Sequence, residues 1–229
     1  MASDASIPLT VPLSQQLWVR NRDVIHACLH CAFVRGLADG TLPRPAFAYY
    51  VGQDAFFLQA FARAYSLAAA KTTTTEDFAL FHGLATGVLE ELKLHGRYAQ
   101  EWGLDLAAVG PGAATRRYVD FLLATAWGQG PIAIAAAMVP CMRLYAYLGQ
   151  ELGRSGIPDH AYGPWIATYG GEEFEALAQR LEGLLDRHGQ ASLEIESAYR
   201  YAMDCELNFF EAAILAGREV GHGGPGMGT

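Results

Sequence analysis

Three side chains that could do chemistry lie in segments too apolar to form a solvated surface: the thiol of Cys141 and the carboxylates of Asp54 and Glu206. Cys141 follows Pro140 in an Ala-rich run at 131–149, where an interior proline is expected to kink or break a helix. A thiol beside such a break can face a cavity. A pocket that holds a thiol and two buried acids would suit covalent catalysis with acid–base assistance.

Each of these residues also has a purely structural interpretation. Free Cys is among the most buried residue types. A buried carboxylate is costly without partners, but Asp54 or Glu206 could simply accept hydrogen bonds that fix the core. Aromatic neighbours favour a pocket, because Phe209 or Phe210 must share the helix face of Glu206. Spacing alone leaves both interpretations open.

Two further clusters could suggest a metal. Residues 26–31 contain two His and two Cys, but on a helix Cys28 and Cys31 share a face that the histidines do not, and no second pair at zinc spacing follows. Glu91 and His95 are four residues apart, yet a di-iron bundle would need further inward Glu and His ligands. We therefore expect no metal and no cofactor, and a surface helix pair at Glu91 and His95.

The composition limits the partners. The chain has 229 residues, of which 52% are hydrophobic, and a net charge of -8 from 24 acidic and 16 basic residues. It has no Lys/Arg-rich run, so we do not expect nucleic acid as a partner. The N-terminus lacks a signal-peptide pattern, and the apolar run at 131–142 is shorter than the roughly 20 residues that span a bilayer. We expect a soluble, cytoplasmic protein that binds a small molecule, with its four Cys as thiols.

Helical spacing of apolar residues, punctuated by Gly and Pro, predicts an all-α bundle, and we find no paired strand pattern. We expect a flexible leader at 1–10, a single helical domain at 11–217 and a disordered Gly-rich tail at 218–229. Thr74 and Asp77 fit a capping box, and Gly217 fits the residue after a helix end. The predicted helices cover about 12–36, 45–70, 76–102, 113–127, 131–149, 174–185 and 192–216.

Several short motifs, in order along about residues 12–216, resemble the TenA / thiaminase II family of aminopyrimidine hydrolases. That family has the haem-oxygenase-like helical fold and acts in thiamin salvage. The Cys that follows Pro140 matches the branch of the family that has a cysteine at this position, so the chain resembles that branch. The matching segments are Asp39-Gly-Thr-Leu-Pro43, Phe47-x-x-Tyr50-x-x-Gln53-Asp54, Pro140-Cys141 with Leu144-Tyr145, Trp165-Ile166-x-Thr168-Tyr169-Gly170-Gly171 with Phe174, and Glu206 with Phe209-Phe210.

The resemblance implies roles for these residues. Cys141 would be the nucleophile that adds to the pyrimidine ring, and Glu206 would hydrogen-bond a ring nitrogen and move protons. Asp54 would bind the 4-amino group and the adjacent ring nitrogen. Relatives often carry Tyr where this chain has Phe57, so one hydroxyl is missing here. The substrate-binding side chains would be Asp54, Phe57, Tyr118, Tyr145, Tyr169 and Phe209.

The implied reaction is hydrolysis of 4-amino-5-aminomethyl-2-methylpyrimidine to the 5-hydroxymethyl compound and ammonia, with thiamin as a further substrate and a homotetramer as the usual assembly. It needs a Cys141 thiol that is partly ionised near neutral pH. The alternative is a non-catalytic pyrimidine-binding or regulatory helical protein, which an unshifted or raised thiol pKa would favour. A third alternative is a haem or di-iron protein, which is suggested only by analogy with other proteins of the same fold.

Overall fold

The structure, a computed structural model, describes residues 11–101, 103 and 109–222, without the side chains of 94–98, 100–101 and 219–222. Regular structure in these residues is entirely helical, which confirms the all-α prediction. The helices are α1 (Leu13–Arg20), α2 (Arg22–His30), α3 (Ala32–Asp39), α4 (Arg44–Lys71), α5 (Thr75–Glu101), α6 (Ala113–Gly128), α7 (Pro131–Gly153), α8 (Gly163–Gly170), α9 (Glu172–His188) and α10 (Leu193–His222).

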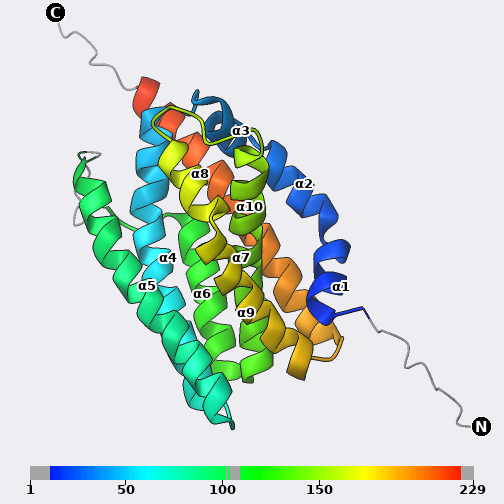
Figure 1. The fold of residues 1–229 in the computed structure, drawn as a ribbon. Helices are drawn as coiled ribbons and strands as arrows, with labels where there is room; N and C mark the ends of the chain where they lie inside the picture. Colours follow the sequence, from blue (N-terminus) through cyan, green and yellow to red (C-terminus); the bar gives the residue numbers. More distant parts are fainter. Residues whose placement is uncertain (1–10, 102, 104–108, 223–229) are drawn as a thin grey trace, which may run out of the picture.

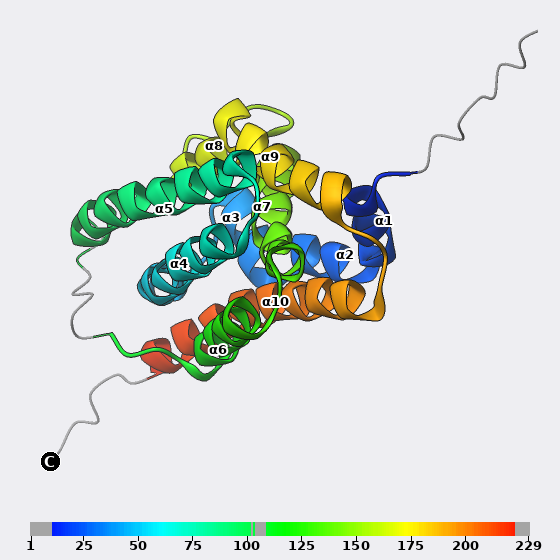
Figure 2. The ribbon, with the colours of Figure 1, turned by 90° about the horizontal axis from the view of Figure 1, so that it is seen from below.

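The most apolar helix, α7, lies in the middle of the molecule (Figures 1 and 2). It packs against α8, α9 and α10, and α4 packs against α5, α6 and α10. The α7 helix of 23 residues is long and apolar enough to cross a membrane. From the sequence we considered only the apolar run at 131–142 and so underestimated the length of the apolar helix. However, 78% of its most apolar window is buried inside the fold, as in the core helix of a soluble protein.

The prediction of one helix over 12–36 was wrong, because this stretch forms α1, α2 and α3. Asn21 separates the first two: its buried side-chain amide donates to the Leu17 carbonyl at 2.8 Å. Such local bonds compete with the helix. Cys31 takes an extended conformation between the second and third. Single-residue interruptions leave the apolar spacing almost unchanged, so the spacing could not reveal them.

Pro140 does not break α7, which continues through it to Gly153. Proline removes one backbone hydrogen bond, and the packing of α4, α6, α8, α9 and α10 around α7 supports the continuous helix. At α5 the predicted capping box is present in part, since the Asp77 amide donates to the Thr74 hydroxyl at 3.1 Å.

The last helix ends later than predicted. We placed its end at 216 with a disordered tail from 218, but α10 continues to His222. Gly217 lies inside the helix, where a Cβ would come within 2.7 Å of the Ala46 Cβ. The glycine therefore permits close packing of α10 on α4 and does not terminate the helix. The predicted leader at 1–10 and the tail at 223–229 lie outside the described residues.

Candidate active site

A cavity of about 260 Å³ lies between α4, α5, α7, α8 and α9. The thiol-bearing Cys141 borders it and is partly accessible, in contrast to most of its neighbours on α7. Its wall is formed by Asp54, Phe57, Leu58, Phe61, Tyr65, Gly83, Leu84, Gly87, Val88, Glu91, Cys141, Met142, Tyr145, Thr168, Tyr169, Glu173, Phe174 and Leu177.

A narrow inner crevice adjoins this cavity and is too tight for a water molecule. Asp54, Phe57 and Tyr145 line both spaces. The crevice alone is bordered by Tyr118, Glu206 and Phe209. Together the two spaces bring all eight residues predicted for the site into one region, although this placement does not test their roles.

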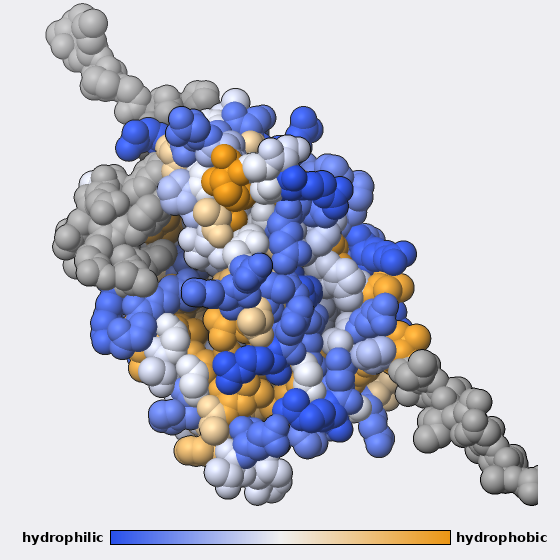
Figure 3. Space-filling model, viewed as in Figure 1, coloured by the Kyte–Doolittle hydropathy of each residue, from blue (hydrophilic) through white to orange (hydrophobic). Residues whose placement is uncertain are grey.

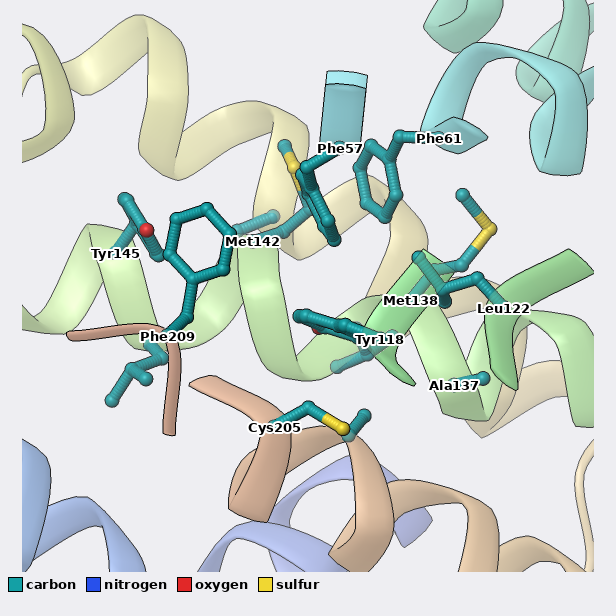
Figure 4. Packing of buried hydrophobic residues seen from close by; sticks show 14 of the residues in the cluster. Phe57, Phe61, Tyr118, Leu122, Ala137, Met138, Met142, Tyr145, Cys205 and Phe209 are labelled. Carbon is teal, nitrogen blue, oxygen red and sulfur yellow. The ribbon is translucent and has the colours of Figure 1, made fainter. Parts of the chain in front are cut away.

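The rings in the crevice come from different helices. Figure 4 shows Phe57 of α4, Tyr118 of α6 and Phe209 of α10 gathered near α7. The centroid of the Phe57 ring lies 4.7 Å from that of Tyr118 and 6.3 Å from that of Phe209. Phe210 instead packs in the core, stacked 5.3 Å from Phe33. Phe209 is therefore the one of the pair that shares the face of Glu206.

Glu206 is buried and its environment favours a proton. Burial, reinforced by the charge of Asp54, raises the pKa of Glu206 to about 8, although hydrogen bonds from Tyr118 and Cys141 act in the opposite direction. The Tyr118 hydroxyl donates to Glu206 Oε1 at 2.7 Å. A carboxyl group with a pKa near neutrality is suited to both giving and taking a proton.

The thiol of Cys141 does not meet the expectation of partial ionisation. Burial raises its pKa well above the usual value, and the charges of Glu206, Asp54 and Glu91 raise it further. A hydrogen bond with Glu206 acts in the same direction. The described residues around the cavity include no Lys, Arg or His to offset these carboxylates. The thiol is therefore protonated at neutral pH.

Gln53 positions the inner crevice. Its side-chain oxygen accepts bonds from the Gly112 amide at 2.8 Å and the Thr115 hydroxyl at 2.6 Å. Its amide nitrogen donates to the Gly110 carbonyl at 3.1 Å. These bonds tie α4 to the beginning of α6, the helix that carries Tyr118. They also explain why an amide next to Asp54 can be buried in an apolar face.

A second network positions the tyrosines of the main cavity. Trp165 Nε1 donates to the Tyr50 hydroxyl at 3.3 Å, and the Tyr50 hydroxyl donates to that of Tyr145 at 3.2 Å. Tyr169 packs against Tyr145 with centroids 4.9 Å apart. The contact is possible because α7 and α8 touch at Gly149, where a Cβ would come within 2.2 Å of the backbone of α8.

An ion-pair network holds the α9 wall. Arg143 Nε donates to Glu182 Oε1 at 2.8 Å, Arg143 Nη2 pairs with Glu182 Oε2 at 2.5 Å, and Arg143 Nη1 pairs with Glu175 at 2.7 Å. These side chains are 15–23% exposed, so solvent screens them little. The network joins α7, two residues after Cys141, to the helix that supplies Phe174 and Leu177 to the cavity.

Sequence reasoning missed two polar residues of the cavity. Glu91, which we assigned to a surface pair, lines the cavity and is half-buried; its expected partner His95 has a side chain outside the described residues. Tyr65 is fully buried. The sequence did contain a pattern that could have predicted Tyr65 as a cavity residue. Its spacing places it on the same helix face as Asp54, Leu58 and Phe61. No group of three or more His, Cys, Asp or Glu suited to a metal occurs among the residues the structure describes.

Comparison with known proteins gives consistent matches. The sequence pattern described as TENA/THI-4/PQQC family matches residues 18–216. The chain is 37% identical over 246 residues to the bifunctional TH2 protein, mitochondrial, of Arabidopsis thaliana, covering 94% of this chain but only 40% of that protein. It is 31% identical over 188 residues to an aminopyrimidine aminohydrolase of Halalkalibacterium halodurans, covering 80% of this chain and 84% of that enzyme.

Solved structures agree on the fold. A TenA homologue protein from P. horikoshii OT3 superposes with a TM-score of 0.84 at 26% identity, covering 90% of this chain and 100% of that one. A domain from Shewanella denitrificans OS217, described as having a heme oxygenase-like fold, superposes with a TM-score of 0.73 at 10% identity, covering 95% of this chain and 97% of that one. The predicted haem-oxygenase-like fold is thereby confirmed.

Proposed function

Because the chain belongs to the TENA/THI-4/PQQC family, we propose that it is an aminopyrimidine aminohydrolase of thiamin salvage. Its substrate would be 4-amino-5-aminomethyl-2-methylpyrimidine, which it hydrolyses to the 5-hydroxymethyl compound and ammonia. The observation that carries this proposal is that the thiol of Cys141 borders an aromatic-walled cavity, and that the buried Glu206 lines the crevice adjoining it. The name of the Halalkalibacterium halodurans relative supports the same activity.

The proposed reaction proceeds by addition and elimination. The sulfur of Cys141 forms a bond to a ring carbon while its proton passes to Glu206, and the displaced ring electron pair settles on a ring nitrogen that is protonated. That pair then expels the amine from the 5-methylene, and the amine takes the proton held by Glu206 and leaves as ammonia. Water adds to the methylene and gives a proton to Glu206, the sulfur–carbon bond breaks, this proton returns to the departing thiolate, and the aromatic ring is restored.

Each neighbouring group has a part in this scheme. The ionised fraction of Glu206, whose pKa is about 8, can take the thiol proton and return it within one turnover. Asp54 would hold the 4-amino group and the adjacent ring nitrogen, and a carboxylate binds a protonated aminopyrimidine more strongly than a neutral group would. Phe57, Tyr118 and Phe209 would stack on the ring.

The raised pKa of Cys141 is consistent with catalysis if the substrate supplies the missing positive charge. A protonated aminopyrimidine placed among Asp54, Glu91 and Glu206 would cancel part of the field that keeps the thiol protonated. The thiolate would then form only when substrate is bound. This also protects the sulfur from oxidation in the empty enzyme, because the thiolate is the reactive form.

The same raised pKa favours a second candidate, a protein of this fold that binds a pyrimidine without turning it over. The two candidates differ in the bound state. In the enzyme, iodoacetamide labelling of Cys141 should show a lower apparent thiol pKa when a small cationic aminopyrimidine occupies Asp54. In a binding protein the bound thiol should stay as unreactive as the free one.

The direct test is ammonia release from 4-amino-5-aminomethyl-2-methylpyrimidine by the purified chain, measured beside thiamin. Steady turnover that is absent from a Cys141→Ser preparation supports the enzyme. Saturable binding of the pyrimidine by calorimetry without ammonia release would instead favour the binding protein. The proposed enzyme is a cytoplasmic homotetramer. Light scattering after size-exclusion chromatography measures the mass of the assembly and so tests the number of subunits.

A further inference from the structure

Three buried side chains form a chain of hydrogen bonds that ends at the candidate site. Trp165 of α8 donates its indole N–H to the Tyr50 hydroxyl of α4 at 3.3 Å, and the Tyr50 hydroxyl lies 3.2 Å from that of Tyr145 on α7. Only the last of the three, Tyr145, lines the inner crevice and the larger cavity outside it, the outer cavity. Trp165 and Tyr50 therefore reach the site only through Tyr145, and the proposed chemistry gives them no part.

The direction of these hydrogen bonds is fixed at the Trp165 end. An indole N–H is a donor and never an acceptor, whereas a hydroxyl can be either. Tyr50 must accept from Trp165, and among the described residues its hydroxyl has one other hydrogen bond, with Tyr145. If Tyr145 donated to Tyr50, the Tyr50 proton would be buried without an acceptor, which is costly. Tyr50 is therefore the donor and Tyr145 the acceptor.

The surroundings of Tyr50 offer its proton no other acceptor. Its ring has four aromatic neighbours with centroids 5.0–6.4 Å away, and none of them carries an oxygen or nitrogen in its side chain: Phe33, Phe47, Phe209 and Phe210. Hydrophilic side chains occupy much of the face shown in Figure 3, but Tyr50 and Trp165 are only 2% and 7% exposed. In such a dry environment successive hydrogen bonds strengthen one another.

The hydroxyl proton of Tyr145 is consequently available to a ligand. Tyr145 accepts from Tyr50 and makes no second hydrogen bond to a described residue. It lines the crevice together with Asp54 and Glu206. Burial raises the pKa of Tyr145 well above its usual value, and nearby charges raise it further, those of Tyr50, Glu206, Asp54 and Cys141. The hydroxyl therefore stays protonated at neutral pH and can act as a donor.

We propose that Trp165 and Tyr50 are positioning residues that make the Tyr145 hydroxyl a hydrogen-bond donor to an acceptor atom of the bound pyrimidine. This inference rests on the proposed function and narrows its substrate class to heterocycles that present a lone pair to Tyr145, such as that of an unprotonated ring nitrogen. A ring with an N–H or C–H at that position leaves the Tyr145 proton without an acceptor and is disfavoured.

The test is a double-mutant cycle on kcat/KM for the aminomethyl pyrimidine. Trp165→Phe keeps an aromatic ring but removes the donor that sets the direction, and it should lower kcat/KM about fivefold. Tyr145→Phe removes the final hydroxyl and should lower kcat/KM about tenfold or more. When Tyr145→Phe is already present, adding Trp165→Phe should change kcat/KM by less than about twofold, because Trp165 acts only through that hydroxyl.

A purely structural role of Trp165 gives a different result. Its ring also packs against those of Tyr145 and Tyr169, at centroid distances of 5.6 and 4.7 Å. If only this packing mattered, Trp165→Phe would lower kcat/KM by the same factor with and without Tyr145→Phe. Equal losses, or no loss in the wild type, would overturn the proposal. Tyr50→Phe gives a second cycle with the same expected pattern, and circular dichroism checks that each variant is folded.

Two control variants make the same chemical changes outside the chain of hydrogen bonds. Trp18→Phe alters a tryptophan that packs on Tyr147, with centroids 5.4 Å apart. Tyr199→Phe removes a buried hydroxyl that has no hydrogen-bond partner in the structure. Neither Trp18 nor Tyr199 lines the cavity or the crevice, so both variants should keep the kcat/KM of the wild type. A loss in either control as large as that of Trp165→Phe would count against the proposal.

A binding arm separates the failure of this inference from that of the proposed function. The 5-hydroxymethyl pyrimidine is titrated by calorimetry into the wild type and into the same variants. If the wild type binds this compound but releases no ammonia, the proposed function fails and the cycle is read from Kd. Non-additive losses of affinity then support the positioning role, and additive losses overturn it. If the wild type neither hydrolyses nor binds a pyrimidine, both proposals fall.

Discussion

The inner crevice and the outer cavity share a wall but are built in opposite ways. In the crevice Tyr118 hydrogen-bonds Glu206 at 2.7 Å and the space is closed to water. In the outer cavity the Tyr65 hydroxyl has no partner, and Gly87 faces open space. The Glu206 carboxyl of the crevice therefore has a hydrogen-bond partner, whereas the Tyr65 hydroxyl of the outer cavity has none.

This difference is what a hydrolase with a constant ring and a changeable leaving group would need. Groups that move protons must be held within hydrogen-bonding distance, because small displacements reduce catalysis strongly. A displaced group has only to enter and leave. Cys141 borders the outer cavity, and Asp54, Phe57 and Tyr145 line both spaces. Changes in either space should therefore separate the effects on chemistry from the effects on substrate choice.

The largest expected effect is that of Cys141→Ser. Serine keeps the size of the side chain but loses the nucleophilic sulfur, so we expect ammonia release to fall below detection with both substrates. Cys31→Ser is the matched control, since Cys31 is half-buried and lies outside the lining of the cavity. Circular dichroism should show both variants folded. Turnover near that of the wild type in Cys141→Ser would remove the covalent mechanism.

Glu206→Gln should have the next largest effect. Glutamine fits the same space and still accepts a hydrogen bond from Tyr118, but it cannot carry a proton between steps. The expected loss is about 10²–10⁴-fold in kcat. If the two regions are independent, this loss is the same for thiamin and for the aminomethyl pyrimidine. A loss confined to one substrate would contradict the separation of crevice and cavity.

Arg143→Met tests the wall of the outer cavity. It leaves Glu175 and Glu182 close together without their cation. We expect about 2–3 kcal/mol lower free energy of unfolding, below the usual value for a fully buried pair because these side chains retain some exposure. Arg200→Met is the control, because the partners of Arg200 are well exposed and its pairs contribute roughly 0–1 kcal/mol. Equal denaturant midpoints in the two variants would be incompatible with this argument.

The pH dependence of stability gives the sharpest test of the crevice. The pKa of Glu206 is about 8 in the folded protein against 4.5 for an unperturbed Glu. The folded state therefore holds the proton more tightly, and its stability falls as pH rises from about 4.5 to about 8. The slope from this group is at most about 1.4 kcal/mol per pH unit.

Glu206→Gln should remove this slope, so the variant should lose less stability than the wild type between pH 5 and pH 8. Urea titrations at intervals across that range measure it. Parallel stability curves for the two proteins would mean that Glu206 is not held in its protonated form by burial, and that the crevice is wetter than its geometry indicates.

Much of the fold and of the candidate site could be predicted from the sequence. The apolar spacing within 45–70 and 76–102 anticipated α4 and α5 within two residues at each end. Carboxylates in apolar faces pointed to Asp54 and Glu206, because an acid has few other reasons to lie there. The apolar spacing did not reveal the residue that interrupts a helix at Asn21, and at Pro140 the helix does not break but continues to Gly153.

The chain alone determined which helices have buried faces and which of their residues can react, because hydrophobic spacing and side-chain chemistry are local properties. Only the tertiary structure decided the protonation of Cys141, since the three carboxylates that raise its pKa come from α4, α5 and α10. The same holds for Tyr65 and Glu91, which face a common space only after α4 and α5 pack together. Electrostatic fields and unfilled volume depend on distances between helices, and no pattern along one helix contains those distances.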